Sequence, residues 1–278
     1  MTAEDAVSYV SGRTRMFGII GDPIEQVRSP EMVTAEMKQR GQDALLVPLH
    51  VLPADFDDVL PRLMKLANLG GLVFTIPYKV RAATLAASYG AALGPQARIV
   101  GAINALGRGA DGKWRADIFD GLGCVEAFRR KGHAFKGKRV MLLGAGGAGA
   151  AIGVAIAYEG PAAIRLFDVD AGRAAALVAK IRSVDAGIAA EAGAPTVDGV
   201  DYLINATPVG MLTDVRLPLP VESLPARLVV LDAIVKPERT PLLALAERCG
   251  CPTIGGREMM RGQIATMVDF FGYKRAGA

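Results

Sequence analysis

With 278 residues, the chain is long enough for one large domain or two of ordinary size. Charged residues make up 22% and hydrophobic residues 51% of it, as is typical of a globular protein, and a net charge of +4 without a basic stripe argues against a nucleic-acid-binding surface. No apolar run reaches the length of a membrane span, and the polar segment 1–15 is not a signal peptide.

The first third of the chain predicts alternating strands and helices. Strands are expected at 16–20, 45–47 and 72–76, and helices at 29–41, at 56–66 and after Lys79. Ser29-Pro30 is a typical helix start, with the serine as N-cap and the proline at the first helical position. This alternation favours a mostly parallel sheet.

A hairpin is predicted next. Residues 99–106 and 114–119 are apolar segments on either side of Asp111-Gly112, which is a strong signal for a tight turn. If these two residues form the turn centre, Asn104 lies opposite Phe119. The hairpin would then return Asp120 to the neighbourhood of Asn104.

The most informative segment is Gly144-Ala145-Gly146-Gly147-Ala148-Gly149, which follows the apolar strand 140–143 and precedes a helix at 150–158. Strand, glycine-rich turn and helix in this order are the fingerprint of a dinucleotide site. Gly144 allows the turn, Gly146 lets the backbone approach a pyrophosphate, and Gly149 lets the helix pack closely on the strand, while the helix N-terminus attracts phosphate. Asp168 ends the next strand about 20 residues later, where an acid can bind the adenosine ribose. A packing turn without a nucleotide is the alternative.

The remaining elements complete an α/β protein. A helix at 121–130 leads into the nucleotide-binding part, and after Asp168 we expect a helix at 171–182, strands at 202–206, 228–234 and 253–254, and a last helix at 258–271. Gln263 lies beside the apolar face of that last helix. Three cysteines, Cys124, Cys249 and Cys251, do not suggest a disulfide framework and favour a cytoplasmic location, and two separate histidines argue against a metal site.

Several polar residues are candidates for catalysis. Lys79 follows a strand at the carboxyl end, where open α/β sheets place their ligands, and a lysine with a lowered pKa can exchange a proton with a hydroxyl. A solvated surface lysine is the alternative. Asp120 can equally be a helix cap, and Thr75, Asn104 and Gln263 can have purely structural roles.

Taken together, these residues resemble the shikimate/quinate dehydrogenase family over nearly the whole chain after residue 15. The matching motifs are Gly21-Asp-Pro-Ile24 with Ser29-Pro30, Thr75-Ile-Pro-Tyr-Lys79, Gly101-Ala-Ile-Asn104, Asp120-Gly-Leu-Gly123, Gly144–Gly149, Asn205-Ala-Thr-Pro-Val-Gly-Met211, Asp232 with Pro237, Thr240-Pro-Leu-Leu243, and Met259-Met260 with Gln263.

The resemblance implies an N-terminal α/β substrate domain, residues 14–120 completed by the helix 258–278, and a Rossmann-type nucleotide domain, residues 121–257. It makes Lys79 and Asp120 the catalytic pair, with Lys79 taking the proton while a hydride passes to the nicotinamide. It assigns the ring hydroxyls and carboxylate of the substrate to Arg28, Ser29, Thr75, Asn104 and Gln263. The cofactor residues that it implies are Gly144, Ala145, Gly146, Gly147, Ala148, Gly149, Asp168, Arg173, Thr207, Pro208, Gly210, Met211 and Gly256.

Departures from the family pattern point to altered substrate recognition and to NAD. One carboxylate-binding serine is replaced by Val27, and further polar positions are replaced by Val73, Phe119 and Val235. Family members that use NADP typically have Asn-Arg-Thr where this chain has Asp168-Val-Asp170. We therefore expect NAD to be preferred over NADP, although Arg173 is near enough in sequence to reach a 2′-phosphate.

The sequence thus predicts an oxidoreductase that transfers a hydride between NAD and a shikimate- or quinate-like cyclic hydroxy acid, acting as a monomer or homodimer. A dehydrogenase for a related ring, such as an aminated analogue, is one alternative. A ligand sensor without turnover is another, although such a protein needs no Lys79–Asp120 pair. A nucleotide-binding partner protein is a third.

Overall fold

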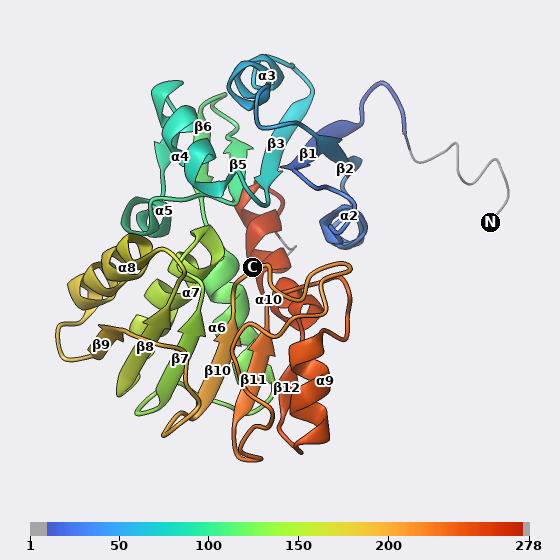
Figure 1. Ribbon diagram of the computed structural model, residues 1–278. Coiled ribbons are helices and arrows are strands. Elements are labelled where there is room, and N and C mark those ends of the chain that lie inside the picture. The colour runs from blue at the N-terminus through green and yellow to red at the C-terminus, as the bar shows by residue number, and fades with distance from the viewer. Residues whose placement is uncertain (1–9, 275–278) are drawn as a thin grey trace, which may run out of the picture. The chain divides into compact units, whose positions relative to one another are not determined.

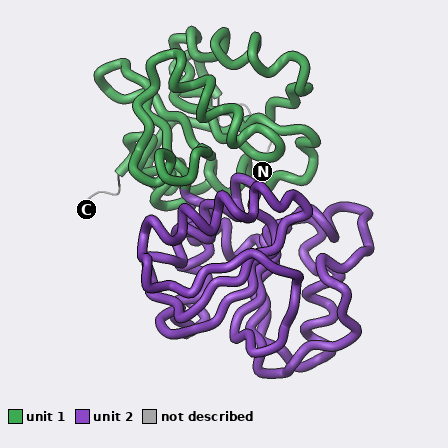
Figure 2. Tube along the Cα trace, turned by 60° about the vertical axis from the view of Figure 1, so that its left-hand side comes forward, with its two compact units in different colours: residues 1–118, 264–278 green, residues 119–263 purple. Residues whose placement is uncertain are grey.

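The computed structural model describes residues 10–274 and divides into two compact units. The first unit contains the chain up to Ile118 and again from Ile264 onward, and the second contains residues 119–263 (Figures 1 and 2). The last helix of the chain therefore begins in the second unit and ends in the first.

The first unit is built on a mixed six-stranded sheet in the order β2-β1-β3-β5-β6-β4. β1, β2 and β3 are parallel, as the alternating pattern predicted, whereas β5 and β6 form an antiparallel hairpin. The strands are β1 (Arg15–Gly21), β2 (Ala44–His50), β3 (Leu69–Phe74), β4 (Ala92–Leu93), β5 (Ala105–Arg108) and β6 (Trp114–Asp117). The helices that belong wholly to this unit are α2 (Ser29–Gln39), α3 (Phe56–Leu63), α4 (Lys79–Ser88) and α5 (Pro95–Val100).

Two local predictions in this unit are wrong. Ser29 is not the N-cap of α2, because it is already helical and Arg28 occupies the cap position without a side-chain hydrogen bond. Residues 99 and 100 belong to α5 rather than to a strand. The start of α5 at Pro95 and its left-handed cap at Gly101 (φ 71°) are ordinary helix signals that outweigh the β-branched residues between them.

The hairpin is confirmed, but its register differs by one residue from the prediction. Ala105 pairs with Asp117 and Arg108 with Trp114, so Asn104 comes opposite Ile118 rather than Phe119. The reason is the loop, which has an odd number of residues and places Gly112 in the left-handed region (φ 76°). A two-residue turn centred on Asp111 and Gly112 would have shifted the pairing by one position.

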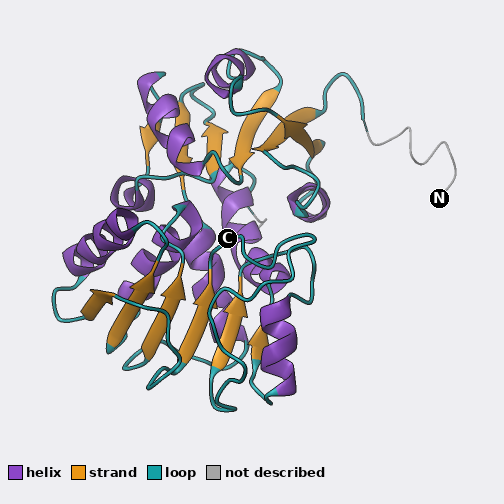
Figure 3. Ribbon diagram, in the orientation of Figure 1, coloured by secondary structure: helices purple, strands orange, loops and turns teal. Residues whose placement is uncertain are grey.

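The second unit is an all-parallel sheet in the order β12-β11-β10-β7-β8-β9 (Figure 3). Counted from β7, this is the order 3-2-1-4-5-6 of the doubly wound nucleotide-binding fold. The strands are β7 (Arg139–Leu143), β8 (Ala163–Phe167), β9 (Ala189–Ala192), β10 (Tyr202–Asn205), β11 (Val229–Asp232) and β12 (Thr253–Ile254). The helices are α6 (Asp120–Arg130), α7 (Gly147–Ala157), α8 (Ala171–Val184), α9 (Pro241–Arg248) and α10 (Gly256–Phe270), of which α10 continues into the first unit.

This strand order places a switch point between β7 and β10. The chain leaves β7 toward β8 on one side and leaves β10 toward β11 on the other, so the loops after these two strands diverge. Open α/β sheets bind their ligands in the crevice outside the carboxyl ends of such strands. The loop at 144–149 follows β7 and the loop at 207–211 follows β10, which puts both predicted cofactor loops at the switch point.

Candidate active site

The glycines of the loop after β7 have different structural roles. Gly144 has a φ of +95°, which L side chains rarely adopt. A Cβ on Gly149 would lie 2.0 Å from the carbonyl oxygen of Gly144, so only glycine lets α7 pack this closely on the end of β7. Gly146, by contrast, has an ordinary φ of −68°, and a Cβ there would meet no protein atom within 4 Å. The fold itself therefore does not require a glycine at 146.

A carboxylate holds this loop in place. The Asp168 Oδ2 atom accepts a hydrogen bond of 2.7 Å from the amide of Ala145, and Oδ1 accepts one of 2.8 Å from the amide of Asp170. The Arg173 guanidinium donates to the same Oδ1 at 2.8 Å. Burial opposes the charged form, but these donors hold the pKa of Asp168 below its ordinary value. Gly147, Ala148 and Gly149 form the first turn of α7, where amide groups lack partners within the helix.

The loop after β10 rests on a buried polar network that the sequence analysis did not assign a role. The Asn205 Oδ1 atom accepts hydrogen bonds from the amide of Thr207 at 3.0 Å and from its hydroxyl at 2.7 Å. The Asn205 Nδ2 atom donates to Asp232 Oδ1 at 3.1 Å, and the Thr240 hydroxyl donates to Asp232 Oδ2 at 2.7 Å. Burial raises the pKa of Asp232 to about 6, although these hydrogen bonds favour its charged form.

Only one sequence feature marks this network. Asn205 and Asp232 each end an apolar strand, and they are register partners in neighbouring strands. The network fixes the turn that contains Thr207, Pro208, Gly210 and Met211, in which Gly210 has a φ of +97°. Gly256 has a packing reason of its own, because a Cβ there would lie 2.3 Å from the carbonyl oxygen of Ile234.

Three candidate residues of the first unit converge at the carboxyl end of β3. Thr75 directly follows β3, and its amide donates to the carbonyl of Ile20 at 3.0 Å. Lys79 is the first residue of α4, and its carbonyl accepts a hydrogen bond of 2.9 Å from the amide of Ile103. The neighbouring Asn104 is buried, and its carbonyl accepts the amide of Phe74 at 2.9 Å. The backbone of Thr75, Lys79 and Asn104 thus lies around the carboxyl end of β3, while the roles of these residues in binding and catalysis stay predictions.

The backbone before Lys79 is firmly held. Tyr78 is buried, its ring stacks on Phe56 with centroids 4.2 Å apart, and its hydroxyl donates to the carbonyl of Val51. Lys79 therefore extends from a rigid helix start rather than from a loose surface loop.

The loop that leads to the predicted carboxylate-binding segment starts beside Thr75. A Cβ on Gly21 would be 2.3 Å from the Thr75 Cγ2 atom, so the loop leading to Ser29 leaves β1 next to that threonine. Arg28 pairs with Glu31 at 3.6 Å on the surface of α2, and both side chains are about half exposed. Arg28, at the cap position, is thus engaged with a carboxylate in the first turn of α2.

Asp120 and Gln263 belong to the second unit and lie against one another. Both are buried, and the Gln263 Nε2 atom donates to Asp120 Oδ1 at 3.4 Å. A pair of glycines explains this contact. A Cβ on Gly123 would lie 2.6 Å from the Met259 carbonyl oxygen, and one on Gly262 would lie 2.6 Å from the Gly123 carbonyl oxygen. Backbone contact between α6 and α10 therefore sets Gln263 beside Asp120.

The chain is similar to known proteins over most of its length. A model of the shikimate dehydrogenase substrate binding domain matches residues 19–106. The chain is 32% identical to the shikimate dehydrogenase (NADP(+)) of Rhodospirillum rubrum, over 91% of this chain and 90% of that protein. The chain belongs to the shikimate dehydrogenase family. It is an NAD(P)-dependent oxidoreductase of the shikimate/quinate dehydrogenase type.

Two solved structures show the same fold. The shikimate 5-dehydrogenase of Listeria monocytogenes, in complex with shikimate and NAD, matches this family member with a TM-score of 0.81 at 30% identity, covering 96% of this chain and 95% of that one. The 5-ketofructose reductase of Gluconobacter sp. strain CHM43 matches with a TM-score of 0.77 at 28% identity, covering 94% of each chain. These similarities confirm the predicted fold class.

The residues of the second unit fit a nicotinamide dinucleotide. A side chain at position 146 would occupy the open space beside the Gly146 backbone, where a pyrophosphate can approach. The first turn of α7 offers amide donors, and Asp168 offers an acceptor for ribose hydroxyls. No group of three metal-ligating side chains occurs among residues 10–274. Within the same residues, no helix is both long and apolar enough to cross a membrane.

Proposed function

We propose that this family member transfers a hydride between NAD and a ring carbon that carries a hydroxyl or ketone, in a cyclic compound of the shikimate or quinate type. The observation that carries the proposal is the convergence of Thr75, Lys79 and Asn104 at the end of β3, with the Lys79 carbonyl bonded to the Ile103 amide at 2.9 Å. A lysine amine, a threonine hydroxyl and an asparagine amide carried by the backbone around one strand end are suited to a polyhydroxylated ring.

In the oxidative direction, Lys79 accepts the proton of the hydroxyl that becomes a ketone, and in reduction its ammonium returns this proton. When bound, the nicotinamide cofactor accepts or supplies the hydride. Asp120 acts as the second member of the catalytic pair, and Gln263, which donates to Asp120 Oδ1 at 3.4 Å, binds a ring hydroxyl. Thr75 and Asn104 bind the remaining hydroxyls, while Ser29 and Arg28 are assigned to the carboxylate.

Substrate recognition differs from that of shikimate-specific relatives. Val27 replaces a carboxylate-binding serine, and Arg28 is paired with Glu31. Losing one hydrogen bond to a charged group weakens binding by about 1.5–3 kcal/mol, or roughly one to two orders of magnitude. We therefore infer weak activity on shikimate and a better substrate that is less polar or differently substituted. The 5-ketofructose reductase match supports, as a second candidate, a hydroxyketone without a carboxylate.

NAD is the proposed cofactor. Asp168 and Asp170 lie next to a single guanidinium, Arg173, which is already paired with Asp168 at 2.8 Å. A 2′-phosphate at this place would face two carboxylates, whereas the hydroxyl of NAD could donate to one of them. Relatives are known with each cofactor, since the Rhodospirillum rubrum protein is named for NADP(+) and the Listeria monocytogenes structure contains NAD.

The test is an assay of NAD⁺ and NADP⁺ reduction with hydroxylated cyclohexane and cyclohexene carboxylic acids, including an aminated analogue, together with 5-ketofructose reduction by NADH and NADPH. Turnover of a ring acid with NAD⁺ would support the proposal, and turnover of 5-ketofructose alone would favour the second candidate. Saturable binding of cofactor and acid without turnover would indicate that the protein is a ligand sensor and not an enzyme.

Three free cysteines, two of them buried, support a cytoplasmic location.

A further inference from the structure

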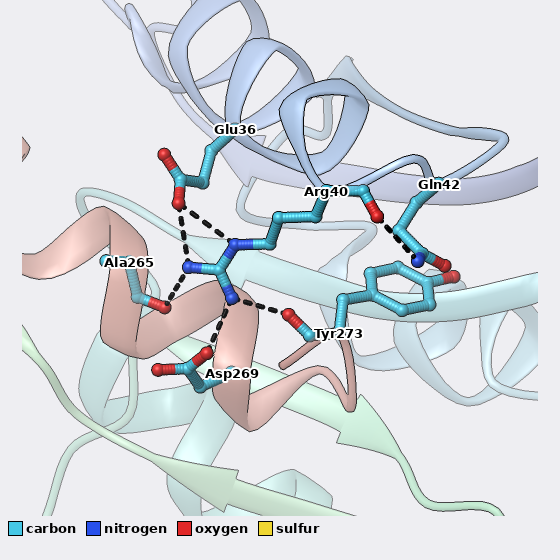
Figure 4. Close-up of polar contacts among 6 residues, drawn as sticks. All are labelled: Glu36, Arg40, Gln42, Ala265, Asp269 and Tyr273. Carbon is cyan, nitrogen blue, oxygen red and sulfur yellow. Dashed lines mark hydrogen bonds and ion pairs between the residues drawn. The ribbon is translucent and has the colours of Figure 1, made fainter. Parts of the chain in front are cut away.

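The first unit contains a buried guanidinium, that of Arg40, at the C-terminal end of α2. The Arg40 side chain is only 3% exposed. Its Nε and Nη2 atoms donate to the Glu36 carboxylate at 2.9 and 2.7 Å, and Nη2 also donates to the Ala265 carbonyl at 3.1 Å (Figure 4). Its Nη1 atom donates to the Asp269 carboxylate and to the Tyr273 carbonyl. All five N–H groups of the guanidinium are thereby used.

We refer to Glu36, Arg40, Ala265, Asp269 and Tyr273 as the Arg40 cluster. Ala265 and Asp269 are four residues apart and lie on one face of α10, and Tyr273 lies just beyond the end of that helix. Arg40 therefore binds two successive levels of the helix and the segment that follows it. Such a pattern fixes both the rotation and the translation of the helix.

Apolar contacts bring the same segment close to the sheet. The ring of Phe17 in β1 lies 4.9 Å from that of Phe271 and 5.8 Å from that of Tyr273. A Cβ on Gly71 in β3 would lie 2.9 Å from the Phe271 ring, and one on Gly107 in β5 would lie 3.1 Å from it. This close packing leaves little room for the end of α10 to move along the sheet, and the hydrogen bonds of Arg40 keep the helix in the rotation that the packing requires.

Arginine is specifically suited to this position. Burial disfavours the charged form, yet the hydrogen bonds from Arg40 to Glu36 and Asp269 raise the pKa of the guanidinium above its ordinary value. A lysine has a single point charge with three donors and cannot reproduce the planar fork that reaches two carboxylates and two carbonyls.

We propose that Arg40 is a positioning residue for Gln263, an inference that rests on the proposed function. Ala265, whose carbonyl Arg40 binds, is two residues after Gln263 in the same helix. A rotation of α10 would therefore displace the Gln263 amide, which binds Asp120 at 3.4 Å and a ring hydroxyl of the substrate. Arg40 itself does not touch the substrate, since the 11 residues of α2 place it about 16 Å along the helix from Ser29.

The experiment compares Arg40→Met with Asp269→Asn, which keeps the shape of the side chain and removes only its charge. Arg108→Met is the matched control, because Arg108 belongs to the same unit, donates to the Leu66 carbonyl at 3.1 Å and stacks on Trp114 at 4.7 Å, but has no bond to α10. For each full-length variant, KM for the best ring substrate, kcat, the dissociation constant for NADH and the melting temperature are measured. Hydrogen exchange of peptides from 256–270 is followed in parallel.

Arg40→Met should raise KM for the ring substrate about tenfold, and Asp269→Asn about threefold, with kcat reduced less and NADH affinity unchanged. In a Gln263→Ala background, Arg40→Met should change KM by less than about twofold, because the group that it positions is gone. Amide exchange in α10 should rise in both variants and not in Arg108→Met.

Three results would overturn the inference: an unchanged KM in a folded Arg40→Met protein, the same KM increase in Arg108→Met, or a full effect that persists without Gln263. If Arg40→Met does not fold, Asp269→Asn decides by the same measures. If the unmodified protein turns over no candidate compound, the proposed function fails. The exchange experiment then tests the Arg40 cluster by itself, and unchanged exchange in α10 would refute it.

Discussion

Two glycines of the nucleotide loop, only three residues apart, should respond to alanine in opposite ways. At Gly149 the added Cβ would lie 2.0 Å from the Gly144 carbonyl oxygen and must move about 1 Å away from it, so α7 has to shift from the end of β7. Overpacking of this kind destabilises by about 1–3 kcal/mol. At Gly146 the Cβ meets no protein atom within 4 Å, and a φ of −68° suits alanine. Removing glycine there should stabilise by about 0.4–1 kcal/mol through the unfolded chain.

NADH binding should be weakened by alanine at Gly146, where the substitution does not reduce stability. If the bare backbone at Gly146 serves a pyrophosphate, Gly146→Ala should raise the dissociation constant for NADH at least about tenfold, equivalent to about 1.4 kcal/mol, while KM for the ring substrate stays unchanged. Urea unfolding gives the stabilities, and fluorescence titration with NADH gives the affinities. A Gly146→Ala protein that is destabilised, or that binds NADH as tightly as the unmodified protein, would refute the reasoning.

The other predictions concern the reacting centre, the cofactor, the substrate and pH. Lys79→Ala should lower kcat by roughly two to four orders of magnitude, and Asp120→Asn should lower it similarly. The double variant should lower kcat by far less than the product of the two single reductions. Near-normal turnover by Lys79→Ala would show that this lysine is a solvated surface residue without a catalytic role. Asp168→Asn should increase kcat/KM for NADP⁺ relative to NAD⁺ by about tenfold, since it removes a negative charge beside Arg173, and an unchanged ratio would contradict this. Val27→Ser should lower KM for shikimate more than it raises kcat; low-micromolar KM in the unmodified protein would show that the serine is not needed. Because the pKa of Asp232 is raised from 3.8 to about 6, the folded state binds a proton more tightly and the free energy of unfolding falls as pH rises between these values. Relative to Asp232→Asn, the unmodified protein should lose about 2–3 kcal/mol between pH 4 and pH 7 in urea unfolding.

Features that depend on a local backbone requirement could be predicted from the sequence. The Gly144–Gly149 turn is one example, because a positive φ and a close carbonyl contact each demand glycine at a fixed spacing. The position of Lys79 is another, since it depends only on a strand that ends before a helix begins. Both features were found because their cause and their sequence signal lie within a few residues of each other.

Features that depend on distant partners left no such signal. The sequence shows Arg40 as one of 32 basic residues, and nothing near it reveals that Asp269, 229 positions later, completes its site. Asn205 and Asp232 were part of a resemblance, but their hydrogen bond depends on strand register. The hairpin error has a different, local origin, because the loop has one residue more than a turn centred on Asp111 and Gly112 would give, and one additional residue changes every pair in the ladder.

In the proposed function, proton transfer and substrate recognition depend on different kinds of contact. Asp120 and Gln263 are set beside each other by the backbones of Gly123 and Gly262, and Lys79 by the rigid start of α4. None of these contacts involves the segment with Val27, whose side chain lies in a loop before α2. We therefore expect a replacement there to change substrate binding without moving Lys79 or Asp120. On this proposal, a serine can be lost at position 27 while Lys79 and Asp120 are retained.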